Sequence, residues 1–511
     1  MPLIRSVSPD DESGAIIETE CKLSNGLPAL VIVGLASKAV DEAKDRVRAA
    51  FSSCNLPMPQ KRITINLAPA DLHKEGSSLD LAIALSILAE TKHISEANVK
   101  NSVVIGELGL NGMIRPVRGI IGRLQAAKRA GLKTAYIPQA NMEQARLVPD
   151  ITLRAATDLK TMVQYLSGQA SGIEETITAA NKQTAYSPGK AEPTPEVDMS
   201  DVTGQQQAKR ALEIAAAGGH NVLLHGPPGT GKSMLAKALV GILPPMNTEE
   251  VLEVTHVHSL ASRQYDEVVT KRPFKSPHHS ASEISIVGGG QTPRPGEISL
   301  SHRGVLFFDE LPEFKRMVIE ALRQPLEDNI ISVSRAKARV DYPANFTFVA
   351  TANPCPCGYF NTPDKECSCA PSAILRYQQK LSGPIMDRID LHVPVHEVLH
   401  DRLLQHQKDG DPSAAIKQRV DQARQRQYQR NKNQTKLNAT LSNQHIKQQA
   451  QLSDDASELL NQAAKKLHIS ARAYMKCVKV ARTIADLDGT EETSAKHITE
   501  ALQYRQPVLQ L

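Results

Sequence analysis

One eight-residue run constrains the possible folds of this 511-residue chain more than any other feature. Gly226–Ser233 reads GPPGTGKS, follows the apolar stretch Asn221–His225 and precedes the helical pattern of Met234–Val240. Glycines let backbone N–H groups turn inward around phosphates, at the positive end of the helix that follows. A strand, this loop and a helix in that order predict an α/β domain that binds a nucleoside triphosphate. The predicted contacts are Gly226, Pro227, Pro228, Gly229, Thr230, Gly231, Lys232 and Ser233.

A pair of carboxylates follows about eighty residues later. Gly304–Phe308 has the pattern of a buried strand and ends in Asp309-Glu310. At the carboxyl end of a parallel strand, Asp309 would hold Mg²⁺ together with the Ser233 hydroxyl, and Glu310 would polarise the attacking water. Lys232 would contact the β and γ phosphates of ATP. In isolation the two acids could be surface residues, but beside a complete phosphate loop they predict ATP hydrolysis.

Length and patterning divide the chain into several parts, and 511 residues suggest roughly three domains. We expect a mixed α/β domain at 1–167, and a linker rich in Ser, Thr, Ala, Gly and Pro at 168–200. Residues 201–400 alternate helices with apolar strands, which predicts a parallel sheet, and 401–511 predict a helical domain. No stretch is apolar for long enough to cross a bilayer, and no leader peptide is evident at the start. We therefore expect a cytoplasmic protein without membrane contact.

Apolar periodicity predicts the elements of the amino-terminal domain. A hairpin is expected from Val103–Leu108 and Met113–Val117, turning at Asn111-Gly112. The other predicted elements are strands at Ala15–Cys21, Ala29–Val33, Arg62–Leu67 and Ala135–Pro138, and helices at Ala39–Phe51 and Leu79–Leu88.

Three positions after the phosphate loop resemble functional positions of AAA+ ATPases. Asn353, after the predicted strand Thr347–Thr351, is similar to sensor 1, which orients water against the γ-phosphate. Arg388 lies in a segment that resembles the AAA+ arginine finger, and this resemblance implies a ring with ATP sites between subunits. An ordinary surface pair with Asp387 is the alternative. Arg472 resembles sensor 2, a lid contact to the phosphates, and Arg482, one helical face away, is the other candidate.

The region before the carboxylate strand carries the closest family resemblance. It reads FKSPHHSAS at Phe274–Ser282, VGGG at Val287–Gly290 and PGEISL at Pro295–Leu300. These motifs resemble magnesium-chelatase-like AAA+ proteins of the YifB/ComM type, and the resemblance covers nearly the whole chain. It implies an ATP- and Mg²⁺-dependent hexameric helicase that drives DNA branch migration in natural transformation. The alternative is a chelatase-type or chaperone-like motor that remodels a protein partner. His278 and His279 would contact nucleotide or DNA, or serve packing.

A predicted hairpin supplies a physical basis for contact with DNA. Ile330–Tyr342 alternates so that Arg335, Lys337 and Arg339 would share one face. In a six-fold ring such hairpins would line the channel and contact phosphates of single-stranded or branched DNA; a solvated basic face is the alternative. Residues 401–450 contain ten Lys or Arg against four Asp, a net charge of +6. We interpret this basic segment as a solvated helical face, with DNA contact as the alternative.

The amino-terminal domain resembles the proteolytic domain of Lon-type (S5-type) proteases. Lys74–Ser78, before a helix, parallels the segment that carries the Lon nucleophile, which would place that nucleophile at Ser78. A Ser–Lys dyad needs a lysine to accept the hydroxyl proton. Ile121 stands where the Lon lysine would be, and isoleucine is not a base. We therefore expect no peptidase activity, although an ATP-dependent protease remains a rival interpretation.

Four of the seven cysteines are crowded into one short segment directly after Asn353. Cys355, Cys357, Cys367 and Cys369 form two C-x-C pairs separated by nine residues. Four thiolates at this spacing can hold one tetrahedral Zn²⁺ ion and stiffen a loop that has little else to bury. The alternative is a set of reduced free thiols.

Overall fold

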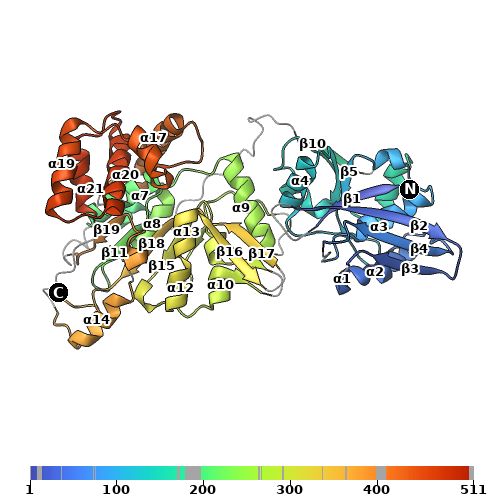
Figure 1. The fold of residues 1–511 in the computed structure, drawn as a ribbon, viewed down its shortest axis with the longest axis horizontal. Helices are drawn as coiled ribbons and strands as arrows, with labels where there is room; N and C mark the ends of the chain where they lie inside the picture. Colours follow the sequence, from blue (N-terminus) through green and yellow to red (C-terminus); the bar gives the residue numbers. More distant parts are fainter. Residues whose placement is uncertain are drawn as a thin grey trace. The chain divides into compact units, whose positions relative to one another are not determined.

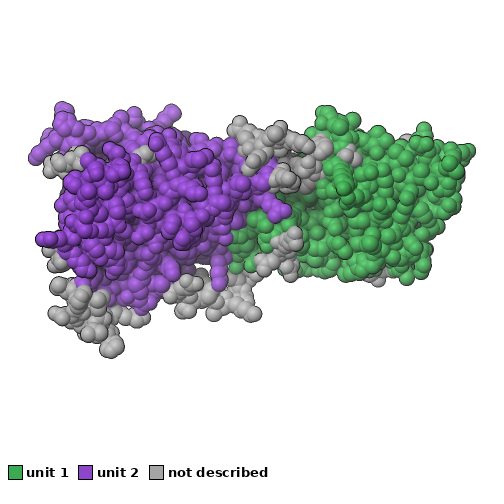
Figure 2. Space-filling view, turned by 90° about the horizontal axis from the view of Figure 1, so that it is seen from below, with its two compact units in different colours: residues 1–187, 247–270 green, residues 188–246, 271–511 purple. Residues whose placement is uncertain are grey.

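The computed structural model describes residues 2–8, 14–35, 37–72, 74, 76–169, 173–178, 197–262, 265, 267–290, 293–335, 338–362, 365–381, 383–398 and 410–505. The chain forms two compact units (Figure 2). Unit 1 comprises Met1–Ser187 and Asn247–Thr270, and unit 2 comprises Pro188–Met246 and Lys271–Leu511. Unit 1 is therefore discontinuous in sequence. Among the described residues, no helix is both long and apolar enough to span a membrane.

Unit 1 is built on an eight-stranded mixed sheet with the order β10-β9-β8-β5-β1-β2-β4-β3. Its strands are β1 Leu3–Val7, β2 Ile16–Ser24, β3 Ala29–Val33, β4 Arg62–Ala68, β5 Ser102–Val104, β8 Thr134–Pro138, β9 Thr152–Ala156 and β10 Glu174–Ile177. The predicted strands are confirmed. Strands β2 and β3 are consecutive but do not pair, because β4 lies between them, antiparallel to β2 and parallel to β3. Strand β10 lies inside the predicted linker, where it pairs with β9.

Helices cover this sheet because each presents an apolar face to it. Helix α3 (Asp80–Glu90) is buried along nearly its whole length, and its Asp80 carboxylate is neutralised by Arg46 at 2.6 Å. The predicted helix at Ala39–Phe51 is divided at Glu42. The predicted hairpin is shorter than expected, since Val103 and Val104 belong to the main sheet. The remaining elements are α1 Lys38–Asp41, α2 Ala43–Ser53, α4 Ile120–Arg129, α5 Met142–Ala145, α6 Leu159–Leu166, and the hairpin β6 Glu107–Leu108 and β7 Ile114–Arg115.

Helix α9 (Thr248–Ala261) follows the nucleotide-binding segment in sequence but belongs to unit 1. It starts with a capping box in which Asn247 and Glu250 exchange side-chain and backbone hydrogen bonds. It packs against α4, where an ideal Cβ on Gly122 would lie 2.5 Å from Cε1 of His256. The two helices approach this closely because Gly122 has no side chain.

Unit 2 contains a parallel five-stranded sheet with the order β12-β15-β18-β11-β19 (Figure 1). The alternation of helix and strand is therefore correctly predicted as a parallel sheet. The strands are β11 Val222–His225, β12 Phe274–Lys275, β15 Val305–Phe308, β18 Thr347–Ala352 and β19 Leu391–Pro394. The three central strands, β15, β18 and β11, are largely apolar and are buried apart from His225, as expected for strands covered on both faces.

Further helices and short strands surround this sheet. They are α7 Gln206–Gly218, α8 Lys232–Ile242, α10 Glu283–Val287, α11 Glu297–Leu300, α12 Arg316–Ala321, α13 Arg323–Asp328, α14 Pro371–Gln379, α15 Gly383–Met386, β13 Gly288–Gly289 and β14 Arg294–Pro295.

The described residues 410–505 form a helical region, as predicted. Its helices are α17 Ser413–Asn431, α18 Asn443–Gln449, α19 Asp454–Lys466, α20 Ala471–Asp488 and α21 Ala495–Gln503. Helix α17 carries much of the basic segment, yet its arginines make internal contacts. Arg424 is buried and donates to the Ala216 carbonyl, Arg430 pairs with the buried Asp486 at 2.6 Å, and Arg419 pairs with Glu213. These arginines therefore hold α17 in place, so they do not form a free basic face.

The hairpin predicted at Ile330–Tyr342 is formed by β16 Ile330–Arg335 and β17 Ala338–Pro343. Its register pairs Arg335 with Ala338, and Ser334 with Arg339. Residues paired across a ladder share a face, and successive residues in a strand alternate. Positions 335 and 339 therefore lie on opposite faces, and the prediction that both share one face is wrong. Lys337 lies outside the described residues.

Candidate functional site

The phosphate loop lies at the carboxyl edge of the parallel sheet, between β11 and α8. Gly229 and Gly231 adopt φ values of 79° and 84°, which favour glycine. Gly226 packs against the residue that follows strand β19, because an ideal Cβ at Gly226 would lie 2.1 Å from the carbonyl oxygen of Val395. The glycines thus give the loop both its turn and its close packing against the chain at the end of β19. This is the geometry that a phosphate-binding loop requires.

Lys232 is buried beneath this loop, 8% exposed. Its ammonium donates to the carbonyl oxygens of Gly226 and Pro227 at 2.8 and 2.6 Å, and to Oδ1 of Asn353 at 3.2 Å. Burial lowers the pKa of Lys232, and the carboxylates of Asp309 and Glu310 oppose that shift. A phosphate that entered the loop would replace these acceptors with stronger ones.

The two predicted carboxylates emerge from β15 next to the loop. Oδ2 of Asp309 accepts from the Ser233 hydroxyl at 3.0 Å, so the two predicted Mg²⁺ ligands are already neighbours. The other oxygen of Asp309 accepts from the Thr351 hydroxyl at 2.6 Å. Thr351 also accepts from the backbone N–H of Glu310 at 2.7 Å. One buried hydroxyl on β18 therefore orients both acidic residues.

Asn353 joins the two halves of the site. Its Nδ2 donates to Oε1 of Glu310 at 3.2 Å, while its Oδ1 accepts from Lys232. The structure thus brings together Lys232, Ser233, Asp309, Glu310 and Asn353, which the sequence placed at the ends of different elements. The side-chain amide lies where it can hold a water between Glu310 and a phosphate.

Two contributors were not predicted from the sequence. Thr351 looks like an ordinary β-branched strand residue, and only its place opposite the carboxylate strand reveals its contacts. Gln205, with φ of 57°, donates to the carbonyl of His396 at 2.6 Å and to that of Thr230 at 3.4 Å. Gln205 ties the loop to the chain after β19, and no motif marks it.

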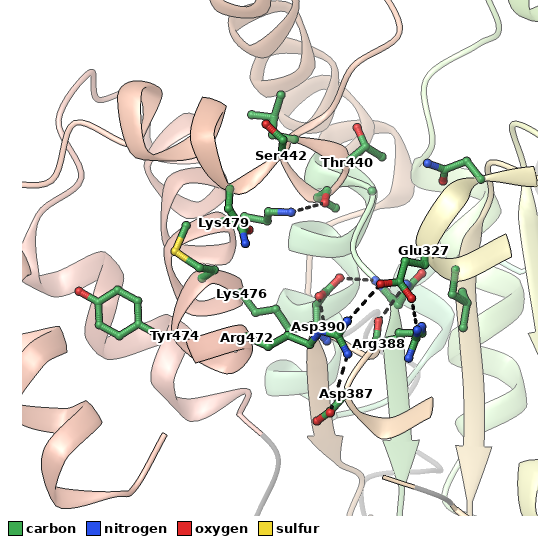
Figure 3. A pocket seen from close by; sticks show the side chains of 18 of the residues that line it. Glu327, Asp387, Arg388, Asp390, Thr440, Ser442, Arg472, Tyr474, Lys476 and Lys479 are labelled. Atoms are coloured by element: carbon green, nitrogen blue, oxygen red, sulfur yellow. Dashed lines mark hydrogen bonds and ion pairs between the residues drawn. The ribbon is translucent and has the colours of Figure 1, made fainter. Parts of the chain in front are cut away.

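Arg388 and Arg472 lie at the other edge of the sheet (Figure 3). Both form ion pairs with Glu327, the second at 3.1 Å. They line a groove of about 1010 Å³ together with Asn221, Phe346 and Asp390, which directly precede β11, β18 and β19. These are the amino ends of parallel strands. Because four-residue strands are about 13 Å long, the arginines lie more than a strand length from their own phosphate loop.

The groove is charged, and its cations come from two regions of the chain. Arg472 is half exposed, whereas Arg388 is largely covered. Burial raises the pKa of the Asp390 carboxyl, but Lys476 and His220 outweigh burial and hold that pKa below its usual range. Arg482, the alternative to Arg472, is buried against Asp486 at 2.8 Å. Arg482 is therefore a core residue, and Arg472 remains the candidate for an exposed phosphate contact.

The four clustered cysteines converge in space. Their sulfur atoms all lie within 4.8 Å of one another, and none forms a disulfide. A backbone N–H from Tyr359 lowers the pKa of the Cys357 thiol. At Cys367 and Cys369 the effect of a backbone N–H is outweighed by hydrogen bonds from Cys357 and Cys355, which raise the pKa of both thiols. Thiolate is the form of cysteine that binds metals. Tetrahedral Zn–S bonds of about 2.3 Å place sulfur atoms roughly 3.8 Å apart, and the recorded Sγ–Sγ separations of 3.3, 3.5 and 3.6 Å are close to that.

The candidate nucleophile of unit 1 is enclosed. Ser78 is 5% exposed, and its hydroxyl accepts from Arg123 at 3.0 Å. A guanidinium stays protonated and cannot accept a proton. Ile121 is fully buried in the core. The residues that contact Ser78 thus stabilise a fold and are not arranged as a nucleophile and base.

The predicted contacts to DNA cannot be placed from side chains. Arg335 and Arg339 have backbone positions in β16 and β17, and Lys337 lies outside the described residues. The rings of His278 and His279 lie 4.1 Å apart and are tilted by 34°. His279 meets Phe314 edge to face, and Phe314 stacks on Phe308, the residue before Asp309. Both histidines are exposed beside the carboxylate strand.

Comparisons with known proteins agree with this site. The model described as "Magnesium chelatase, subunit ChlI" matches residues 198–403, "Subunit ChlI of Mg-chelatase" matches 19–141, and "Magnesium chelatase, subunit ChlI C-terminal" matches 410–505. The YifB protein of Salmonella typhimurium is 43% identical over 490 residues, which cover 96% of this chain and 94% of that protein. The competence protein ComM of Haemophilus influenzae is 44% identical over 492 residues, with the same coverage. The chain belongs to the YifB/ComM family of magnesium-chelatase-like AAA+ proteins.

The family assignment agrees with the architecture of unit 2. The match at 198–403 spans the phosphate loop, the carboxylate strand and Asn353, and the match at 410–505 spans the helical region. Membership indicates an ATPase that uses ATP and Mg²⁺. A magnesium-chelatase 38 kDa subunit of Cereibacter sphaeroides is 28% identical over 179 residues, only 30% of this chain. The chain thus resembles YifB and ComM along its length and a chelatase subunit over a smaller part.

Proposed function

We propose that this YifB/ComM-family protein hydrolyses ATP at a site shared by two neighbouring protomers of a ring, and that the ring moves DNA. One observation carries the proposal. The cluster around Lys232, Asp309 and Glu310 lies at the carboxyl edge of the sheet, whereas Arg388 and Arg472 line a groove at the amino edge. If the arginines serve an ATP site, that site is on another subunit, and a closed hexamer satisfies this relation.

Each residue at the carboxyl edge has a role that its contacts explain. The loop N–H groups and Lys232 bind the phosphates. Ser233 and Asp309 would hold Mg²⁺, and the ion would neutralise charge on the phosphates. Glu310 accepts a proton from the attacking water, and Asn353 keeps that water and the carboxylate in line. Thr351 positions both acids through its hydroxyl. Glu310 is exposed, so a water can reach it from solvent.

The arginines complete the site from the neighbouring protomer. Negative charge spreads over the transferring phosphate in the transition state, and a guanidinium stabilises it. In this chain Arg388 and Arg472 share the Glu327 carboxylate, so both are held at the groove before a phosphate arrives. A nucleotide on the adjacent subunit would compete with Glu327 for them.

We favour DNA as the substrate that this motor moves. A relative that matches along its whole length bears the name competence protein, and we extend to this chain a role in natural transformation as a branch-migration helicase. Strands β16 and β17 carry Arg335 and Arg339 on their two faces, and in the sequence Lys337 comes between them. In a ring, these cations would meet the phosphates of single-stranded or branched DNA from both faces of the hairpin. The second candidate is a motor that remodels a protein partner, which the partial similarity to chelatase subunits favours.

Two further assignments complete the proposal. The four-cysteine loop holds one Zn²⁺ ion, because its sulfur atoms converge at distances that suit tetrahedral coordination. The amino-terminal Lon-like fold serves assembly or DNA handling and has no peptidase activity, because Ser78 is enclosed and paired with Arg123. We place the protein in the cytoplasm, where ATP and the DNA intermediates occur.

The test is an ATPase assay without DNA, with single strands and with a four-way junction. We expect turnover that rises on junction DNA and falls to background in a Glu310→Gln variant. Reversing the charges at Arg335, Lys337 and Arg339 should remove the stimulation and leave nucleotide binding unchanged. If DNA has no effect on the native protein, the DNA assignment is wrong, and a partner protein becomes the better candidate. If Glu310→Gln turns over ATP at the native rate, the hydrolytic site itself is wrong.

A further inference from the structure

The cysteine loop begins at the residue that joins the two halves of the nucleotide site. Asn353 contacts Lys232 and Glu310, each at 3.2 Å, and Cys355 follows two residues later with its side chain fully buried. The carbonyl of Pro354 accepts from Gln378 at 3.2 Å, which anchors the start of the loop on helix α14. A shift of the first cysteine pair would therefore be transmitted directly to the Asn353 side chain.

The same loop touches the phosphate loop at a second point. Gly358 lies just after the first C-x-C pair with φ of 88°. An ideal Cβ at Gly358 would lie 2.6 Å from Cδ and 3.0 Å from Cγ of Pro228. The backbone of Gly358 therefore packs directly on a proline of the phosphate loop, and a side chain at this position would displace one of the two loops.

The thiols hold the two ends of this loop together. Cys355 lies 3.3 Å from Cys357 and 3.6 Å from Cys367, so the two ends of the loop are brought together at sulfur. Backbone N–H groups also donate to these sulfurs, from Phe360 to Cys355 at 3.3 Å and from Cys357 to Cys369 at 3.4 Å. N–H donors stabilise thiolates, and several thiolates at this distance repel one another unless a cation lies between them.

We propose that a soft divalent metal, Zn²⁺, in the four-thiolate site clamps the nucleotide site, so that metal occupancy controls ATP hydrolysis. The metal fixes the cysteine loop, and the loop in turn fixes Asn353 from one side and Pro228 from the other. Loss of the metal would release Asn353 from Glu310 and slow hydrolysis. Nucleotide would still bind, because Lys232 and the loop glycines do not belong to the cysteine loop. The inference rests on the proposed hydrolytic site for its kinetic consequence.

Two variants separate the effect of the metal from the effect of the contact between Gly358 and Pro228. Cys367→Ser with Cys369→Ser removes half of the ligands and leaves Asn353 and Cys355 unchanged. Gly358→Val keeps all four thiols and disrupts the contact with Pro228. Cys54→Ser, at a buried lone cysteine of unit 1, is the matched control for thiol loss. The measurements are bound zinc by elemental analysis, nucleotide affinity with a fluorescent ADP, ATP turnover, and hydrogen exchange of residues 226–233.

We expect the native protein and the Cys54→Ser control to carry zinc at one ion per chain. The double serine variant should lose the zinc, lower kcat at least about tenfold, and raise hydrogen exchange in 226–233, with nucleotide affinity within about threefold. Gly358→Val should keep the zinc and show the same two changes. A native protein without bound metal would overturn the metal assignment. Unchanged exchange in 226–233 after zinc loss would overturn the clamp, even if the native protein shows no ATPase activity and the proposed function fails.

Discussion

Removing the Thr351 hydroxyl tests how the two acids of the site are held. Thr351→Val replaces the hydroxyl with a methyl group of similar size at a fully buried position. Two hydrogen bonds disappear, the one donated to Asp309 at 2.6 Å and the one accepted from the Glu310 N–H at 2.7 Å. The fold around β18 should survive, because valine suits a buried strand. The effect should therefore appear in catalysis.

The expected loss of catalytic rate follows from the free energy that each of the two lost hydrogen bonds contributes. A buried N–H without a partner costs about 1–3 kcal/mol, and a bond to a charged group contributes about 1.5–3 kcal/mol. Asp309 and Glu310 are both exposed, so water replaces part of each lost bond, and both contributions belong at the low end of these ranges. We take about 2.7 kcal/mol in all, which corresponds to roughly a hundredfold in kcat if it falls on the transition state.

The assay compares kcat and nucleotide affinity in three proteins. Thr351→Ser keeps the hydroxyl and is the matched control, so its kcat should stay within about threefold of the native value. Thr351→Val should lose roughly a hundredfold in kcat and retain nucleotide binding through Lys232 and the loop. The reasoning is refuted if Thr351→Val and Thr351→Ser have the same kcat as the native protein.

Three other predictions use different parts of the structure. Gly226→Val should abolish nucleotide binding, because the added Cβ would collide with the Val395 carbonyl. Gly383→Ala is the control, because no atom lies near its added Cβ, and this variant should bind nucleotide normally. Burial lowers the pKa of His256 to about 4. The fold therefore loses stability as the pH drops below the unfolded pKa of about 6.5, and the loss in the free energy of unfolding reaches about 2 kcal/mol at pH 5. A His256→Leu variant should lack this part of the pH dependence in thermal melts. A fragment of residues 188–511 should aggregate, and it should become more soluble when 247–270 is replaced by a short linker, because α9 packs His256 on Gly122 and Leu260 on Gly119 of unit 1. Equal solubility of the two fragments would contradict this.

The nucleotide site was predictable because its chemistry follows the ends of parallel strands. Asp309 and Asn353 each come directly after a buried strand, and Lys232 follows strand β11 at the end of the phosphate loop. The strands of one parallel sheet end at the same edge. Their contacts therefore follow from topology once the sheet is recognised. Thr351 has no comparable signal, because its role depends on which strand lies beside β15, and sequence alone does not give strand order.

The features that could not be predicted from the sequence depend on contacts between distant parts of the chain. Nothing in the sequence of α9 says that its apolar face packs on α4, because a helix face does not identify its partner. Arg388 and Arg472 resemble phosphate contacts, yet only the fold shows that they lie at the edge opposite their own phosphate loop. The hairpin register shows the same limit, since a shift of one residue moves Arg339 to the other face.

The most direct test of the shared ATP site is a mixing experiment with two variants that are inactive alone. Lys232→Ala removes the phosphate contact and keeps Arg388, whereas Arg388→Ala removes the arginine and keeps the phosphate loop. In mixed rings, roughly a quarter of the interfaces would combine an intact loop with an intact arginine. We predict that mixing restores ATP turnover to about that fraction of the native rate. Turnover that stays at the sum of the two variants, in rings verified by a tag on one of them, would contradict a site built from two protomers.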